Sequence, residues 1–293
     1  MPIKIYEYYT MEYLGLQITI LLLNSINLIL QSIGSYILIN LYRNGGDSVQ
    51  RLLVINLSIT EGLLSVVGTM ATIAEMVSGK DRDSSDVFDK YISIFRNAGL
   101  IFMYYFTMYY ITIDRLLAIY LNIKYHLYCN EANAKWLLII TWTMVVLLVT
   151  SVVFATAYTP FEYEKPFNLY LLAPLGILFL VIAIFTYGSI FVKFREKCSN
   201  PTTTHVTNIS SFTIFRRSKF YEPVLLITTF IVFVLVPGGI YFALAFVHGK
   251  RTYLMGILVL ISYVVSNISD VFIYVFVQAD VRKHLWKLMK REN

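Results

Sequence analysis

Two carboxylic acids placed inside otherwise uncharged, apolar stretches are the residues of this sequence best suited to chemistry. Glu61 interrupts an apolar run that begins at Leu52, and Asp270 interrupts the run from Thr252 to Gln278. An ionised carboxylate in the middle of a membrane costs at least about 2.5 kcal/mol unless it pairs or takes up a proton. If these runs lie in lipid, each acid therefore marks a polar site with a specific partner.

A third candidate is Arg115, which follows Asp114 directly after the uncharged run from Asn97 to Ile113. A charge at the end of an apolar helix must reach the membrane surface, pair, or face a cavity. A simple charge that stops the membrane segment and a functional switch are both compatible with this position.

The elements that must hold these residues are predicted from composition. The chain has 293 residues, of which 57% are hydrophobic and only 14% are charged, whereas soluble domains carry about 25% charged residues. Uncharged runs near or above the ~20 residues needed to cross a bilayer recur seven times. We therefore predict an all-α membrane protein, a single domain over residues 1–293 that forms a seven-transmembrane helix bundle. The predicted helices are 14–42, 51–77, 91–120, 136–159, 167–195, 217–247 and 253–278, followed by a cytoplasmic amphipathic eighth helix at 280–291.

Charge predicts which way the bundle sits. The loops at 42–51, 114–135, 193–222 and 280–293 fall on one side and carry 16 Lys and Arg against 7 Asp and Glu. The basic side is predicted to be cytoplasmic, which puts the N-terminus outside the cell in a multi-pass plasma-membrane protein. This one-sided bias already explains the basic charge, so no nucleic acid is expected as a partner. Cys129 and Cys198 both fall on the cytoplasmic side, so no disulfide is expected.

Two segments carry a resemblance to a known family. Residues 114–125 read Asp-Arg-Leu-Leu-Ala-Ile-Tyr-Leu-Asn-Ile-Lys-Tyr, which resembles the Asp-Arg-Tyr-x-Ala-Ile-x-x-Pro-Leu-x-Tyr signature of rhodopsin-like G-protein-coupled receptors. Residues 270–274 read Asp-Val-Phe-Ile-Tyr and resemble the Asn-Pro-x-x-Tyr signature of their seventh helix. Weaker matches are the segment from Asn56 to Glu61, Trp142 in the fourth helix and Pro237 in the sixth.

The resemblance implies a divergent, non-opsin, non-aminergic receptor that couples to a heterotrimeric G protein. Arg115 is then expected to pair with Asp114 at rest and to turn toward the G protein when the sixth helix moves outward. The coupling and switch residues implied in this way are Asp114, Arg115, Tyr125, Tyr274 and Pro237. Val271 replaces the proline of the seventh-helix signature, so the local distortion of that helix is expected to be missing.

The family also places an acid at the position of Glu61 facing the seventh helix, which here carries Asp270. The resemblance therefore implies a shared pocket formed by Glu61, Asp270, Ser35, Ser266 and Asn267. Two like charges in a low dielectric cannot both stay ionised unassisted, so either a sodium ion bridges them or one holds a proton. One neutral carboxyl hydrogen-bonded to the other, with no functional role, is an equal alternative.

The ligand is only coarsely constrained. Asn97 occupies the place of the aspartate that anchors amines in amine receptors, and no lysine occurs from Thr252 to Gln278 for a retinal Schiff base. A small peptide, lipid-like or chemosensory ligand remains. The expected outer cavity is mostly apolar and is lined by Asn97, Glu75, Arg96, Ile101, Phe102, Phe242, Leu260 and Val264.

Two other classes of protein were considered. A membrane transporter could use Glu61 and Asp270 as a mid-membrane ion or proton site, although no internal repeat is visible. An intramembrane enzyme is not expected, because the four histidines are scattered among loops or helix ends and both cysteines lie in loops. No catalytic residue and no cofactor other than the sodium ion is predicted.

Overall fold

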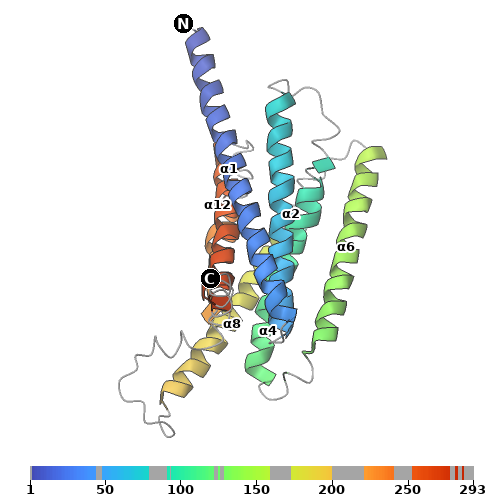
Figure 1. Ribbon diagram of the computed structural model, residues 1–293, viewed down its shortest axis with the longest axis vertical. Coiled ribbons are helices and arrows are strands. Elements are labelled where there is room, and N and C mark those ends of the chain that lie inside the picture. The colour runs from blue at the N-terminus through green and yellow to red at the C-terminus, as the bar shows by residue number, and fades with distance from the viewer. Residues whose placement is uncertain are drawn as a thin grey trace.

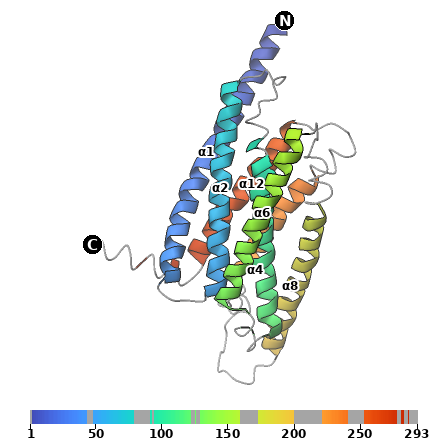
Figure 2. The same ribbon diagram turned by 90° about the vertical axis from the view of Figure 1, so that its right-hand side faces the viewer.

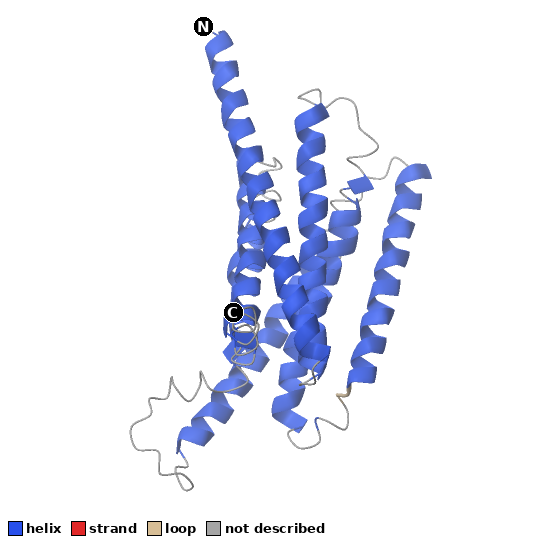
Figure 3. Cartoon of the chain, in the orientation of Figure 1, coloured by secondary structure: helices blue, strands red, loops and turns tan. Residues whose placement is uncertain are grey.

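The computed structural model describes most of the helical part of the chain. The described residues are 2–43, 48–78, 91–92, 94–121, 125, 129–158, 173–199, 221–240, 253–277, 281–282 and 286. Within these ranges the chain is helical almost throughout and contains no strand (Figure 3). The all-α prediction is therefore confirmed.

The helices follow one another along the chain with three π-helical segments among them. The long helices are α1 (Pro2–Arg43), α2 (Ser48–Ser78), α4 (Phe102–Leu121), α6 (Glu131–Tyr158), α8 (Ala173–Ser199) and α12 (Tyr253–Phe272). A shorter helix, α10, covers Tyr221–Phe230. The π-helical segments are η1 (Phe95–Ile101), η4 (Ile231–Leu235) and η5 (Ile273–Val277).

Five helices in the described part of the chain are long and apolar enough to cross a membrane. Their spans are Leu14–Arg43, Val49–Ala74, Glu131–Thr156, Pro174–Val192 and Leu258–Val275, and Val224–Ile240 is a shorter apolar helix. α4 is not among them, because its tyrosines and the pair of Asp114 and Arg115 make it less apolar. These helices make the chain a membrane protein.

The helices pack around α4, which contacts α2, α6, α8 and α10. α1 packs chiefly on α2 and also on α12, and its N-terminal end extends beyond the other helices (Figures 1 and 2). α6 lies at the edge of the bundle in Figure 1. In its most apolar window only 17% of residues are buried, against 61% for α2, so α6 presents most of its surface to lipid and α2 lies inside.

Several helix boundaries differ from the predicted ones. α6 begins at Glu131 rather than at 136, because Asn130 caps it: the Asn133 backbone N–H donates to Asn130 Oδ1 at 2.8 Å. An asparagine in this position satisfies one of the free N–H groups of a first helical turn. Residues 93, 159, 167–172, 217–220, 241–247, 278, 280, 283–285 and 287–291 of the predicted elements lie outside the described residues, and these include most of the predicted eighth helix.

The expectation of an undistorted seventh helix is wrong. α12 passes directly into the π-helical turn η5 at Ile273, three residues after Asp270. A π-helical turn adds a residue per turn and so rotates the side chains that follow it, without any proline. The sixth helix is also distorted, since η4 ends two residues before Pro237.

Candidate functional site

The hub of the buried polar site is Gln31, in the middle of α1. Its Nε2 donates to Glu61 Oε2 and, at 3.1 Å, to the backbone carbonyl of Asn267. Its Oε1 accepts from Ser58 Oγ at 2.7 Å and from the Tyr274 hydroxyl. One amide thus connects α1, α2, α12 and η5, and it uses both ends of its side chain.

Glu61 and Asp270 meet beside this hub, and both are fully buried. Their carboxyl groups are close enough to repel each other when both are charged. Asp270 also accepts from Thr229 Oγ1 at 2.9 Å and from the Tyr104 hydroxyl at 3.2 Å. The structure therefore places the two acids near each other.

Several oxygen atoms around the pair have no hydrogen-bond partner. They are Glu61 Oε1, Asn267 Oδ1, Ser266 Oγ and the Tyr263 hydroxyl, and all are buried. Buried polar atoms are nearly always satisfied in proteins, if not by the protein then by water or an ion. Carboxylate, amide and hydroxyl oxygens are the ligands that hard cations prefer. The cluster therefore supplies the kinds of ligand atom that a sodium ion or a proton binds.

Ser35 and Tyr274 have different neighbours in the structure from those that the sequence predicts. Ser35 Oγ pairs with Ser58 Oγ at 2.7 Å, so it stands one step away from Gln31 rather than against Glu61. The resemblance implies a switch role for Tyr274 beside Arg115, but in the structure the buried hydroxyl of Tyr274 donates to Gln31. Tyr274 therefore belongs to the carboxyl cluster in this conformation.

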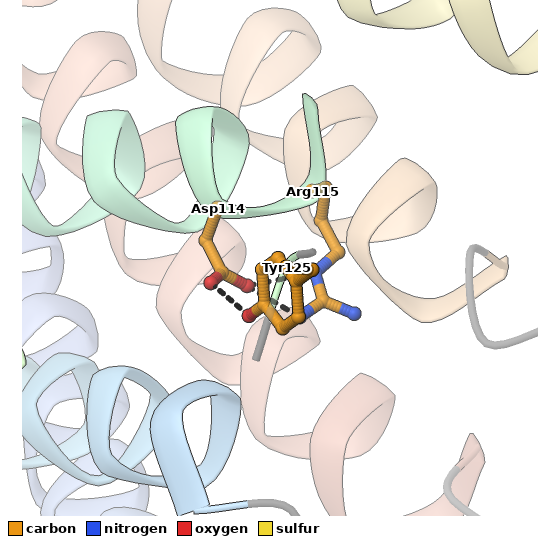
Figure 4. Close-up of polar contacts among 3 residues, drawn as sticks. All are labelled: Asp114, Arg115 and Tyr125. Atoms are coloured by element: carbon orange, nitrogen blue, oxygen red, sulfur yellow. Dashed lines mark hydrogen bonds and ion pairs between the residues drawn. The ribbon is translucent and has the colours of Figure 1, made fainter. Parts of the chain in front are cut away.

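A second buried ionic cluster closes the end of α4. Arg115 Nε donates to Asp114 Oδ2 at 2.9 Å, and both residues are only 6% exposed. The Tyr125 hydroxyl donates to the other carboxylate oxygen, Asp114 Oδ1. Figure 4 shows the three side chains turned toward one another. The sequence prediction that Arg115 pairs with Asp114 is confirmed, and Tyr125 joins them.

The surroundings of Asp114 change the acidity of two neighbours. Burial, together with the hydrogen bond and the negative charge of Asp114, raises the pKa of the Tyr125 phenol well above its usual range. Burial and then Asp114 also raise the pKa of the Cys129 thiol. Cys129 is a free thiol, and its raised pKa makes it a poor nucleophile at neutral pH.

Two residues that carry the resemblance also contact each other. Asn56 Nδ2 donates to Thr107 Oγ1 at 2.8 Å, and Trp142 Nε1 donates to Asn56 Oδ1 at 3.0 Å. One side chain of α2 thereby holds α4 and α6 together.

Pro237 lies in the helical turn that follows η4, half-buried, between the π-helical segment and two glycines. A Cβ added at Gly238 or Gly239 would meet nothing within 4 Å, so this turn is loosely packed. Loose packing beside a missing backbone donor is what a bend requires.

Only some residues of the expected ligand cavity fall in the part of the chain that the structure describes. Phe102 packs on Ile94 and Ala98 with side chains of α6, and its ring lies 4.6 Å from that of Phe106. Ile101 packs against the main core, Leu260 is half-buried and Val264 is buried. The Arg96 side chain is half-buried. Phe242 and the side chains of Asn97 and Glu75 lie outside what the structure describes.

Sequence reasoning missed Gln31, Tyr104 and Thr229. A signal for Gln31 was available, because Asn24, Asn27 and Gln31 recur at helical spacing in an uncharged run. Tyr104 and Thr229 gave no comparable signal, since hydroxyl groups are common in membrane helices.

Comparison of the chain with models of protein families and with curated proteins gives no match.

Proposed function

We propose that this protein is a receptor that transmits an extracellular ligand signal to a heterotrimeric G protein by outward movement of its sixth helix. The observation that carries the proposal is the buried ion pair of Arg115 and Asp114, closed by the Tyr125 hydroxyl at the end of α4. These are the residues by which the sequence resembles rhodopsin-like receptors. A resting receptor of that family is expected to hold this arginine in the same way.

The proposed receptor also has a defined arrangement in the membrane. The bundle crosses the plasma membrane seven times, with the N-terminus outside and the basic loops and an amphipathic eighth helix in the cytoplasm. The five apolar helices and the shorter apolar helix of the sixth span support this arrangement. So does the contact between Asn56 and Trp142, because the family resemblance rests partly on these residues.

The carboxyl cluster is proposed to regulate the receptor by binding sodium or a proton between Glu61 and Asp270. Its support is the unpartnered Glu61 Oε1, with Asn267 Oδ1 and Ser266 Oγ as further free oxygens. Because Gln31 and Tyr274 tie the cluster to α1 and η5, a change of its charge alters the packing of the seventh helix.

A transporter is the second candidate, and one observation favours it. Two fully buried carboxyl groups meet near the middle of the bundle, which is where secondary transporters bind their coupling ions. Transport requires the pair to open alternately to both sides, whereas a receptor requires only that its charge change.

The decisive experiment is nucleotide exchange on purified G proteins of several classes, with the full chain in lipid nanodiscs. Ligands are screened first in cells that read several G-protein pathways together, and agonist-free activity is recorded as well. The proposal predicts exchange that falls at least about tenfold in Arg115→Ala.

The matched control is Lys135→Ala, since Lys135 is an exposed cation whose ion pair with Glu131 lies at the surface. It is expected to keep the capacity for exchange. Ion flux in proteoliposomes that is abolished by Glu61→Gln, with no exchange on any G protein, would instead establish the transporter.

A further inference from the structure

A row of amide side chains lies along one face of α1 and is buried although the helix crosses lipid. The row consists of Gln17, Asn24, Asn27 and Gln31, each at most 4% exposed. Steps of three, four and seven residues keep all four on one face of the helix. An amide buried in a membrane costs free energy unless it finds a partner. A helix that only packs in lipid does not require such a row.

α2 presents a matching row of small and polar residues. It consists of Ser58, Glu61, Ser65, Gly68 and Thr72, which alternate between steps of three and four. The two rows face each other, because Asn27 Nδ2 donates to Ser65 Oγ at 2.7 Å and Gln31 Nε2 donates to Glu61. A Cβ added at Gly68 would lie 3.0 Å from Asn24 Nδ2, so the glycine leaves room for that amide.

The row is incompletely paired in its upper part, toward the N-terminus of α1. Asn24 is 4% exposed, and its Nδ2 has no hydrogen-bond partner. Thr69 Oγ1, one residue after Gly68, and Glu61 Oε1 are also buried without partners. An unsatisfied buried amide destabilises a protein, and bound water is the usual way to satisfy one.

In the opposite direction the polar contacts of this interface are few. Toward the C-terminal end of α1, Ser35 pairs with Ser58, and the residues beyond this pair include Ile37, Leu38, Leu53 and Leu57, which all belong to the buried main core. The row of buried polar side chains therefore extends further from Glu61 toward the N-terminal end of α1 than toward its C-terminal end. At about 1.5 Å of rise per residue, the row from Gln31 to Gln17 covers about 21 Å. This exceeds the half-thickness of a bilayer core, about 15 Å.

We propose that the seam between α1 and α2, lined by Asn24, Asn27, Ser65 and Gly68, holds a file of water that admits small monovalent cations to Glu61 and Asp270. Entry is from the side of the membrane that carries the N-terminus. This inference rests on the pocket proposed above and adds its route of access. The amides do not carry charge themselves; they orient the water molecules that do.

The charges at the inner end of the seam determine which ions can enter it. Among the side chains that the structure describes, α1 contributes neutral amides to the seam, α2 contributes Glu61, and α12 contributes Asp270. The other titratable groups near the pair are phenols, those of Tyr104, Tyr263 and Tyr274. No described cationic side chain faces the pair, so the field at the inner end of the seam attracts cations and repels anions.

Silver ions provide a test, because Ag⁺ is a small monovalent cation that replaces the thiol proton and forms an S–Ag bond. The chain has two cysteines, so a background of Cys129→Ser and Cys198→Ser is free of thiols. Ser65→Cys places a thiol of nearly the same shape in the seam. Intact cells in chloride-free medium are exposed to Ag⁺, and the thiols that remain are alkylated and counted by mass spectrometry.

The expected result is that Ser65→Cys reacts at least about tenfold faster than two control thiols. Ser32→Cys lies on the exposed face of α1, where only lipid reaches it, and Thr186→Cys is buried in α8 away from the seam. Inside-out vesicles should react slowly at Ser65→Cys, since the polar contacts at the other end of the interface are few. Equal rates for the three thiols, or faster entry in inside-out vesicles, would overturn the proposal.

Closing the seam sharpens the test. Asn24→Leu in the Ser65→Cys background should slow the reaction with silver by at least about tenfold. If its thermal unfolding shows that Asn24→Leu does not fold, Gly68→Ala serves instead, because the added Cβ presses on the Asn24 amide. An unchanged silver rate in a folded closing variant refutes the seam. The silver assay needs no G protein. If the protein activates no G protein but shows this pattern of silver rates, the receptor proposal is refuted and the seam proposal stands.

Discussion

At the end of α4 the buried carboxylate of Asp114 meets a guanidinium and a phenol, whereas in the middle of the bundle Glu61 meets a second carboxyl group. The first cluster contains its own balancing charge in Arg115. The second has only neutral donors, chiefly Gln31, and leaves Glu61 Oε1 without a partner. A cluster balanced from within can act as a latch, while one that lacks a positive charge must obtain it from solvent.

The largest expected effect comes from removing the balancing charge of the first cluster. Arg115→Met leaves Asp114 buried and charged, and breaking a buried ion pair in this way costs about 3 to 5 kcal/mol. The free energy of unfolding in detergent, measured by chemical denaturation, should fall by this amount. Arg115→Lys keeps the charge and should lose much less. Equal stability of Arg115→Met and the wild type would show that Asp114 is not held as a buried carboxylate.

A somewhat smaller loss is expected when the hub of the second cluster is removed. Gln31→Leu leaves Glu61, Ser58 and Tyr274 without their shared partner, and it should lower the free energy of unfolding by about 2 to 3 kcal/mol. Ser35→Ala, which removes one hydrogen bond at the edge of the same network, should cost about 1 kcal/mol or less. If Ser35→Ala costs as much as Gln31→Leu, the amide is not the hub.

Substitution of Glu61 should raise the free energy of unfolding, whereas the substitutions of Arg115 and Gln31 lower it. Glu61→Gln keeps an oxygen for the Gln31 amide and removes the need to bind a proton or a cation at the pair, so the protein should gain about 1 to 2 kcal/mol in sodium-free buffer at neutral pH. Added sodium should stabilise the wild type and leave this variant unchanged. A loss of stability in Glu61→Gln would mean that the second cluster is balanced as the first one is.

The smallest effect concerns the pH dependence of the first cluster. The pKa of Tyr125 is raised in the folded protein, so folding favours the protonated phenol. Its contribution is complete below the unfolded pKa of about 10 and is lost as the pH rises from there through the folded value. Tyr125→Phe should cost about 1 kcal/mol at neutral pH. The free energy of unfolding, measured from about pH 8 to 11, should fall less with rising pH in this variant than in the wild type.

Charge made parts of both clusters predictable from the sequence. Glu61, Asp270 and Asp114 are acids in or beside apolar runs, and a charge that is costly in lipid stands out against such a background. Gln31 is neutral, and burying its side chain in a membrane costs less free energy than burying a charged one. A single glutamine in an apolar run therefore does not stand out. Only its spacing from Asn24 and Asn27 points to a buried face.

The side chains that complete the clusters depend on backbone details that periodicity does not show. Tyr274 points to Gln31 rather than toward Arg115 because η5 rotates the end of the seventh helix. The start of α6 depends on the Asn130 cap, and sequence patterns locate such boundaries only to within a few residues. The hydrogen bond from Thr229 to Asp270 joins residues far apart in the chain, and no local pattern encodes it.

Infrared spectroscopy tests most directly whether the carboxyl pair takes up a positive charge. The full chain in sodium-free neutral buffer should show the C=O stretch of a protonated carboxyl group. The band should vanish when Glu61→Gln and Asp270→Asn are combined, and it should persist in Asp114→Asn. A wild-type spectrum without that band, together with no detectable bound cation, would contradict the account, because both buried carboxylates would then be ionised with nothing to balance them.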